Sequence, residues 1–144
     1  MRAVNPKDLV GRTKLPLHVW PASATAVGCM AGHEGLSKYG LVNWRATPIH
    51  LSQYVGALKR HVANLEEGID IDPDSGLLTL SHILMTAAII VDAGVAGTLV
   101  DDRPMPNPGY ADLVKRLTPH VKRITEQYAD RDPKHYTIAD RPKG

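Results

Sequence analysis

The stretch DPDSGLLTLSHILMTAAIIVDAGVA, residues 72–96, decides the fold of this 144-residue chain. Asp72 and Pro73 form a helix-start signal, because aspartate caps helix N-termini and proline suits the first helical position. The residues after them are apolar almost all round, so we expect a helix to about Ala96 that other helices enclose. The run is long enough to examine as a membrane span, but polar residues such as Asp92 favour burial in protein, and we expect no membrane partner.

Three further helices are expected beside this apolar one. Residues 22–37 are rich in Ala and Gly and predict a helix, and apolar residues at helical spacing predict one over residues 110–128 and another that begins at Thr47-Pro48 and ends near Gly68. No convincing pair of strands stands out beside them. The predicted class is therefore all-α, a helical bundle.

The predicted helices form a single domain, residues 1–144. Residues 1–20 contain prolines and short apolar runs, which predict an irregular, extended arm, and residues 129–144 form a polar tail. Four helices in a chain of this length cannot easily enclose the apolar one. We therefore expect a homo-oligomer, a dimer or a tetramer, in which that helix packs against a partner chain.

Composition limits the classes of function. A formal net charge of +2 is too weak to predict a nucleic-acid partner, and a single cysteine excludes an intrachain disulfide or a Cys-rich zinc site. Residues 1–10 lack the apolar region of a secretory signal, so we expect a cytoplasmic protein. No GxxxxGK[ST], HExxH or CxxC motif and no His-Asp pair occurs. The acidic residues are eleven Asp and only four Glu.

Carboxylates gather between the second and third predicted helices, in the acidic hairpin EEGIDIDPD of residues 66–74. Five carboxylates in nine residues repel one another unless a cation lies among them, and oxygen ligands at this density suit Mg²⁺ or Mn²⁺. The alternative is a solvated turn in which Asp72 caps a helix and the other carboxylates face water.

Basic and aromatic residues form a second group after the first predicted helix. Lys38 and Arg45 offer phosphate contacts, Trp44 offers a stacking face, and Asn43 offers an amide that both donates and accepts. These are the groups that a nucleotide site uses. The alternative is ordinary packing, with the basic side chains reaching solvent.

Further polar residues lie on the helices beside the acidic hairpin. Arg60 and His61 add a cation and a titratable group about one turn before it. On the apolar helix, a polar stripe at 4-3-4 spacing either consists of a core histidine with its hydrogen-bonded neighbours or faces a polar site. The stripe comprises Ser75, Thr79, His82 and Thr86.

Several of these motifs occur in the same order in the phage dATP/dGTP diphosphohydrolase family. They are Pro16-Leu17, KYG at 38–40, NWR at 43–45, Tyr54, RH at 60–61, DPDSG at 72–76, His82 and DDRP at 101–104. From about residue 5 to residue 118 the chain resembles that family, and it is most similar to the MazZ-type, MazG-like enzymes of phages that replace adenine by 2-aminoadenine. The resemblance implies an all-α, oligomeric enzyme that depends on a divalent metal and cleaves a (deoxy)nucleoside triphosphate to the monophosphate and pyrophosphate.

The chain departs from the family in its acidic residues. MazG-like proteins use ExxE pairs, which this chain lacks, and Ile69 and Asp74 stand where the phage family usually has Glu. Because the family's Glu pattern is missing, we expect other carboxylates to bind the metal: Asp70 and Asp74, then Glu67, and Glu34, which lies one helical turn before Lys38. We expect Asp70, Asp74 and Glu67 also to act on the attacking water. The resemblance implies substrate contacts from Lys38, Asn43, Trp44, Arg45, Arg60, His61 and His82.

The function expected from the sequence is hydrolysis of a purine deoxynucleoside triphosphate, dGTP by preference, with Mg²⁺ or Mn²⁺ as cofactor. If the chain is phage-encoded, the reaction takes place in the cytoplasm of the bacterial host. One alternative is a broad house-cleaning pyrophosphatase that acts on dATP or non-canonical nucleotides. Another is a non-catalytic nucleotide-binding protein, in which Ile69 marks lost activity.

Overall fold

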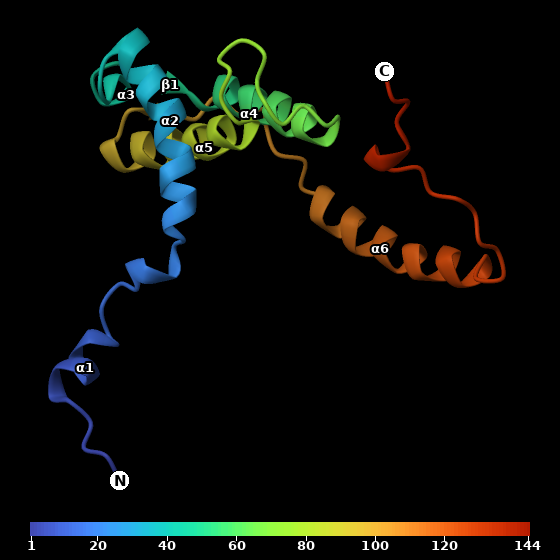
Figure 1. The fold of residues 1–144 in the computed structure, drawn as a ribbon, viewed down its shortest axis with the longest axis horizontal. Helices are drawn as coiled ribbons and strands as arrows, with labels where there is room; N and C mark the ends of the chain where they lie inside the picture. Colours follow the sequence, from blue (N-terminus) through green and yellow to red (C-terminus); the bar gives the residue numbers. More distant parts are fainter. The chain divides into compact units, whose positions relative to one another are not determined.

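Helices make up most of the structure, a computed structural model that describes residues 1–144 (Figure 1). The all-α class predicted from the sequence is confirmed. The α-helices are α1 Pro6–Gly11, α2 Ala22–Tyr39, α3 Asn43–Ala46, α4 Leu51–Glu66, α5 Thr79–Ala96 and α6 Tyr110–Gln127. Two 3-10 turns, Leu17–Val19 and Ile138–Asp140, and two short strands, β1 Ile49–His50 and β2 Leu99–Val100, complete the elements.

The chain divides into two compact units, Met1–Asp102 and Arg103–Gly144. In the first, residues 1–20 were expected to be extended, but they contain α1 and a 3-10 turn, and none of them is buried. In the second unit, α6 agrees closely with the helix predicted over residues 110–128, and no residue of α6 is buried.

Helix α5 is the centre of the first unit, and both α2 and α4 pack against it (Figure 1). One buried hydroxyl fixes α2 on α5. Ser81 accepts a hydrogen bond from the Ala31 backbone N–H at 3.0 Å and donates one to the Val27 carbonyl at 2.6 Å. These two backbone groups lie four residues apart, so a single α5 side chain bonds both ends of one turn of α2. By length and composition, α5 is also the one helix that could cross a membrane.

The apolar helix begins later than predicted, at Thr79, although its predicted end is confirmed. The residues before it form a tight turn, in which Ile71 and Leu78 pair as an antiparallel bridge. Gly76 has a φ of +71°, a conformation that is not helical. The predicted start at Asp72 was therefore wrong, because backbone pairing across the turn competes with a longer helix.

The preceding helix also begins later than predicted. Thr47 and Pro48 were expected to start it, but α4 begins at Leu51. The residues between form β1, which pairs in parallel with β2, and the Ile49 backbone N–H donates to the Thr98 carbonyl at 3.0 Å. This strand pair was absent from the prediction. The predicted end of α4 near Gly68 is confirmed.

The N-terminus of α4 is capped from a distant segment. The Asp102 carboxylate accepts hydrogen bonds from the Ser52 backbone N–H at 2.8 Å and from the Ser52 hydroxyl at 2.6 Å. These hydrogen bonds lower the pKa of Asp102. Because cap and helix are 50 residues apart in the chain, a local reading of the sequence does not find this cap.

Candidate active site

Six polar side chains gather where α2, α4, α5 and the turn before α5 meet, and we call them the junction cluster. It consists of Glu34 and Lys38 from α2, His61 from α4, Asp72 and Ser75 from the turn, and His82 from α5. Four of the six, Glu34, Lys38, His61 and His82, are residues predicted for the site from the sequence. The Ser81 hydroxyl holds α2 on α5 one residue before His82.

Glu34 links the two helices of the cluster. One of its oxygens, Oε1, accepts a short hydrogen bond from the Lys38 ammonium group one turn later on α2. The other, Oε2, lies 3.8 Å from His82 Nε2. The hydrogen bond to Glu34, with a smaller contribution from the charge of Asp72, raises the pKa of Lys38. Lys38 therefore keeps its positive charge throughout the neutral range.

Two imidazole rings form the middle of the cluster. His82 stacks on His61 with ring centroids 5.1 Å apart and planes 18° from parallel. The His82 Nε2 atom lies 2.7 Å from the Ser75 hydroxyl oxygen. His61 Nδ1 is buried and has no hydrogen-bond partner within the chain. Burial, and next the neighbouring His82, lowers the pKa of His61, so this ring favours the neutral form.

Asp72 is 9 % exposed and shapes the turn that carries Ser75. Its Oδ1 accepts backbone N–H groups from Ser75 at 2.8 Å and from Asp74 at 3.1 Å. The hydrogen bond from the Ser75 backbone is the main cause of a lowered pKa of Asp72, so the carboxylate is ionised at neutral pH. The prediction that Asp72 caps N–H groups was right, but those groups belong to a turn and not to a helix.

The cluster is not the triad of a serine nucleophile. In such a triad the histidine contacts the serine through one ring nitrogen and the acid through the other. Here Ser75 and Glu34 both face the Nε2 atom of His82. The arrangement therefore lacks the order of hydrogen bonds that activates a serine for covalent attack.

No three His, Cys, Asp or Glu side chains converge into a preformed metal cage. Glu34 and, more weakly, Asp72 nevertheless both raise the pKa of Lys38. Proteins commonly hold Mg²⁺ with one or two carboxylates, water and substrate phosphates. The carboxylates of the cluster that suit such an ion are therefore Glu34 and Asp72.

The other predicted metal ligands lie at the surface of the acidic hairpin. Glu67, Asp70 and Asp74 are exposed, and no hydrogen bond or ion pair within the chain engages their carboxylates. Arg60 is exposed next to His61, and Asn43 is half-buried at the start of α3. The structure thus leaves these side chains available without joining them to the junction cluster.

Trp44 and Arg45 lie at the other end of α5, where they hold Asp92. Arg45 donates from Nε and Nη2 to the two Asp92 oxygens at 2.7 and 2.9 Å, and Trp44 Nε1 donates to Oδ2 at 2.6 Å. These three residues form the clamp. Its hydrogen bonds, the one from Arg45 first, lower the pKa of Asp92 to about 2. Asp92 follows His82 by ten residues, which is roughly 15 Å along a helix.

Two acidic residues that matter in the structure were not predicted for the site. Asp92 had a usable signal, because a carboxylate in an otherwise apolar helix needs a partner. Asp72 was counted in the acidic hairpin, but its carboxylate was expected to cap a helix and was not named as a site residue. Its place in the junction cluster depends on helices that approach the turn from elsewhere in the chain.

A comparison with known protein families covers both groups of residues. The sequence model described as dATP/dGTP diphosphohydrolase, N-terminal, matches residues 4–103, which is more than half of the chain and includes the junction cluster and the clamp. The match ends next to the boundary of the first compact unit. No curated protein and no solved structure matches the chain. The chain therefore belongs to the dATP/dGTP diphosphohydrolase N-terminal family, a family of hydrolases that act on nucleoside triphosphates.

Proposed function

We propose that the chain hydrolyses a purine deoxynucleoside triphosphate, dGTP by preference, to the monophosphate and pyrophosphate. The observation that carries this proposal is the junction cluster in a member of this family. There Glu34 joins Lys38 to His82, His82 stacks on His61, and Asp72 adds a second carboxylate. The KYG, NWR and DPDSG motifs support a MazZ-type enzyme of the 2-aminoadenine pathway of phages, acting in the host cytoplasm.

The chain's own residues supply positive charge and hydrogen bonds for a triphosphate. Lys38 stays cationic and half-exposed beside Glu34, and Arg60 is exposed next to His61 on α4. Both carry donors that suit phosphate oxygens. Ser75 and His82 add further hydrogen-bonding groups 2.7 Å from each other, and the neutral His61 ring stacks on His82.

Mg²⁺ or Mn²⁺ completes the proposed site. Glu34 and Asp72 would hold the ion together with the phosphates, and the exposed Glu67, Asp70 and Asp74 would hold a further one or orient the attacking water. When bound, such an ion lowers the pKa of a bound water molecule and neutralises charge on the leaving pyrophosphate.

We also propose that the chain works as a homo-oligomer, a dimer or a tetramer, without a nucleic-acid or membrane partner. The support is the apolar surface of α5 left uncovered by α2 and α4, where Val91 is 67 % and Val95 86 % exposed. Apolar surface of this kind on a soluble protein marks contacts with other protein.

The products test the reaction directly. Ion-exchange analysis after incubation with dGTP and Mn²⁺ is expected to show dGMP and pyrophosphate in equal amounts. Deoxyguanosine with triphosphate would contradict the proposed bond cleavage. A panel of dATP, dUTP and damaged nucleotides tests the base preference, and equal rates for all of them would show a broad house-cleaning enzyme instead. Binding of dGTP without metal-dependent turnover would show a non-catalytic protein.

The role of the acidic hairpin is tested by two substitutions. Asp70→Asn and Asp74→Asn are each expected to abolish pyrophosphate release while the helices and the oligomer persist, because both carboxylates are exposed and serve no contact within the chain. Glu66→Gln, at the end of α4, is the matched control and keeps its activity. Turnover retained in both Asp variants would overturn the metal-binding role of the hairpin.

A further inference from the structure

The positive charge of the chain is concentrated in its first residues. Residues 1–20 contain four Lys or Arg and a single Asp, a formal charge of +3, whereas the whole chain carries +2. Residues 21–144 therefore carry a net charge of −1. This segment is exposed throughout, so its charges are not needed to stabilise a core.

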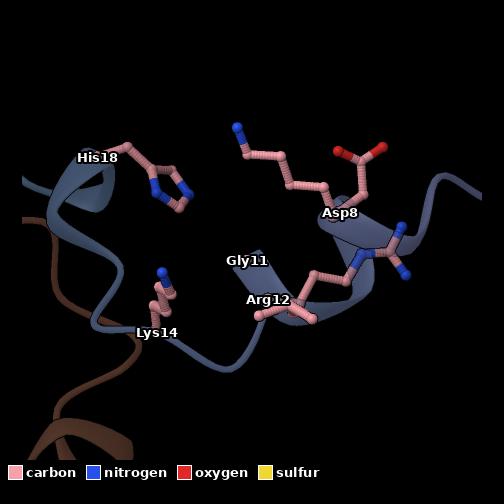
Figure 2. A pocket seen from close by; sticks show the side chains of 7 residues that line it. Asp8, Gly11, Arg12, Lys14 and His18 are labelled. Atoms are coloured by element: carbon pink, nitrogen blue, oxygen red, sulfur yellow. The ribbon is translucent and has the colours of Figure 1, made fainter.

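Between α1 and the 3-10 turn Leu17–Val19 lies an open cleft of about 530 Å³ (Figure 2). The residues that line it are Lys7, Asp8, Val10, Gly11, Arg12, Lys14 and His18. Figure 2 shows the side chains of Lys14 and His18 together on one side of Gly11, and those of Asp8 and Arg12 on the other. Three permanent cations and a histidine are thus among the residues that line this space, although in Figure 2 the Arg12 guanidinium extends past Asp8, away from Lys14 and His18.

These cations have no partner within the chain. Lys7, Arg12, Lys14 and His18 form no ion pair, and the carboxylate of Asp8 forms none either. Their backbone is nevertheless ordered by local hydrogen bonds. The Arg12 N–H donates to the Asp8 carbonyl at 3.1 Å, and the Lys14 N–H donates to the Gly11 carbonyl at 3.2 Å. The unpaired charges are therefore carried by a defined turn.

We propose that this cleft is a second phosphate-binding site, whose ligand is a polyphosphate anion. Arg and Lys donors fit phosphate oxygens, and several unpaired cations in one concave surface attract a multiply charged anion more strongly than one cation does. The volume is in the range of small-ligand sites. The family match begins at residue 4, so the cleft belongs to the family's domain. The choice of a polyphosphate as ligand rests on the proposed function.

The test uses the full chain and inorganic pyrophosphate, titrated by calorimetry without nucleotide at about 50 mM salt, where charge effects are weakly screened. The variant combines Lys7→Gln, Arg12→Gln and Lys14→Gln. Its matched control combines Lys115→Gln, Lys122→Gln and Arg123→Gln on α6, which removes the same charge elsewhere. The wild type and the control are expected to bind pyrophosphate equally, and the arm variant about tenfold or more weakly.

A double variant at the proposed active site separates its contribution to pyrophosphate binding from that of the cleft. Lys38→Gln combined with Arg60→Gln is expected to leave the pyrophosphate binding of the arm intact. If the arm site binds pyrophosphate but no dGTP is hydrolysed, the proposed function fails and the arm site stands. Equal pyrophosphate affinity of arm variant and wild type overturns the arm site, whatever the hydrolysis assay shows.

The polyphosphate is either the triphosphate of a nucleotide or the pyrophosphate released by hydrolysis. A dGTP analogue that has a methylene group between the α- and β-phosphorus atoms distinguishes these two sources. If the arm takes the nucleotide's own triphosphate, the arm variant loses affinity for the analogue and for pyrophosphate together. If it takes the released product, only the affinity for pyrophosphate falls. Orthophosphate or single-stranded DNA binding as tightly as pyrophosphate would overturn the proposal, because it would show an undiscriminating basic surface or a nucleic-acid site.

Discussion

The two ends of α5 use similar residues in different ways. At one end, Glu34 and Lys38 pair with each other, and His61 keeps a buried nitrogen without a partner. At the other end, the side chains of Arg45 and Trp44 direct all their hydrogen bonds in the structure at Asp92. The first group therefore retains a hydrogen-bonding atom, His61 Nδ1, that has no partner within the chain. The second is a completed set of contacts that fixes α3 on α5.

This difference shows that neighbours in the sequence need not share a site. Lys38 and Arg45 are seven residues apart and were predicted to contact the same nucleotide. The turn after α2 carries Arg45 to Asp92, whereas Lys38 remains at the junction cluster. Arg45 is paired with a residue far along the chain and Lys38 with one on its own helix, and the following substitutions measure what each pair contributes to turnover and stability.

The largest expected effect is on turnover. Glu34→Gln removes a carboxylate from the junction cluster and is expected to lower the kcat of pyrophosphate release by about 100-fold or more. Arg45→Gln, in the clamp, is expected to lower kcat by less than about tenfold. Circular dichroism checks that both variants keep their helices. An equal loss of kcat in the two folded variants would place the clamp in the active site and contradict the functional difference between the clamp and the junction cluster.

The next effect is on stability, at the contact that positions the junction. Ser81→Ala removes the two hydrogen bonds that tie α5 to the Ala31 N–H and the Val27 carbonyl and is expected to lower the free energy of unfolding by about 0.5–1.5 kcal/mol. Urea denaturation measures this. Ser37→Ala, which removes an exposed hydroxyl from α2, is the control and is expected to change stability by less than about 0.5 kcal/mol. Equal effects would show that the Ser81 hydroxyl does not hold the two helices.

The clamp is expected to appear in the pH dependence of stability. Folding lowers the pKa of Asp92 from 3.8 to about 2, so its contribution is fully present above about pH 4 and is lost as the pH falls through about 2. Asp92→Asn is therefore expected to flatten the dependence of stability on pH between about 4 and 2. Thermal unfolding across that range measures it. Asp112→Asn on α6 is the control, and a wild-type slope in the Asp92 variant would contradict the lowered pKa.

The smallest effect concerns the cap of α4. Ser52→Ala removes the hydroxyl hydrogen bond to Asp102 but keeps the one from the backbone N–H. The midpoint of thermal unfolding is expected to fall by roughly 1–3 °C, with kcat unchanged. A loss of kcat in this variant would show that the strand pair β1–β2 and its cap act on the junction cluster.

The sequence predicted the helices well and their starts poorly. The apolar and amphipathic patterns placed α4, α5 and α6 and the composition placed α2, because these signals lie within a single segment. The starts of α4 and α5 were wrong because Ile49 pairs with the strand after α5, and Ile71 pairs across a turn. Both partners lie outside the local window in which a start signal such as Asp72-Pro73 is read.

The same limit applies to the candidate site. The sequence by itself determined the all-α class, the family and most of the residue types of the junction cluster, because these follow from local patterns and motif order. Only the tertiary structure decided that Lys38 belongs to the cluster and Arg45 to the clamp, since Arg45 and its partner Asp92 are 47 residues apart. Which charges remain available for a substrate depends on such long-range pairings, and the folded chain alone brings those partners into contact.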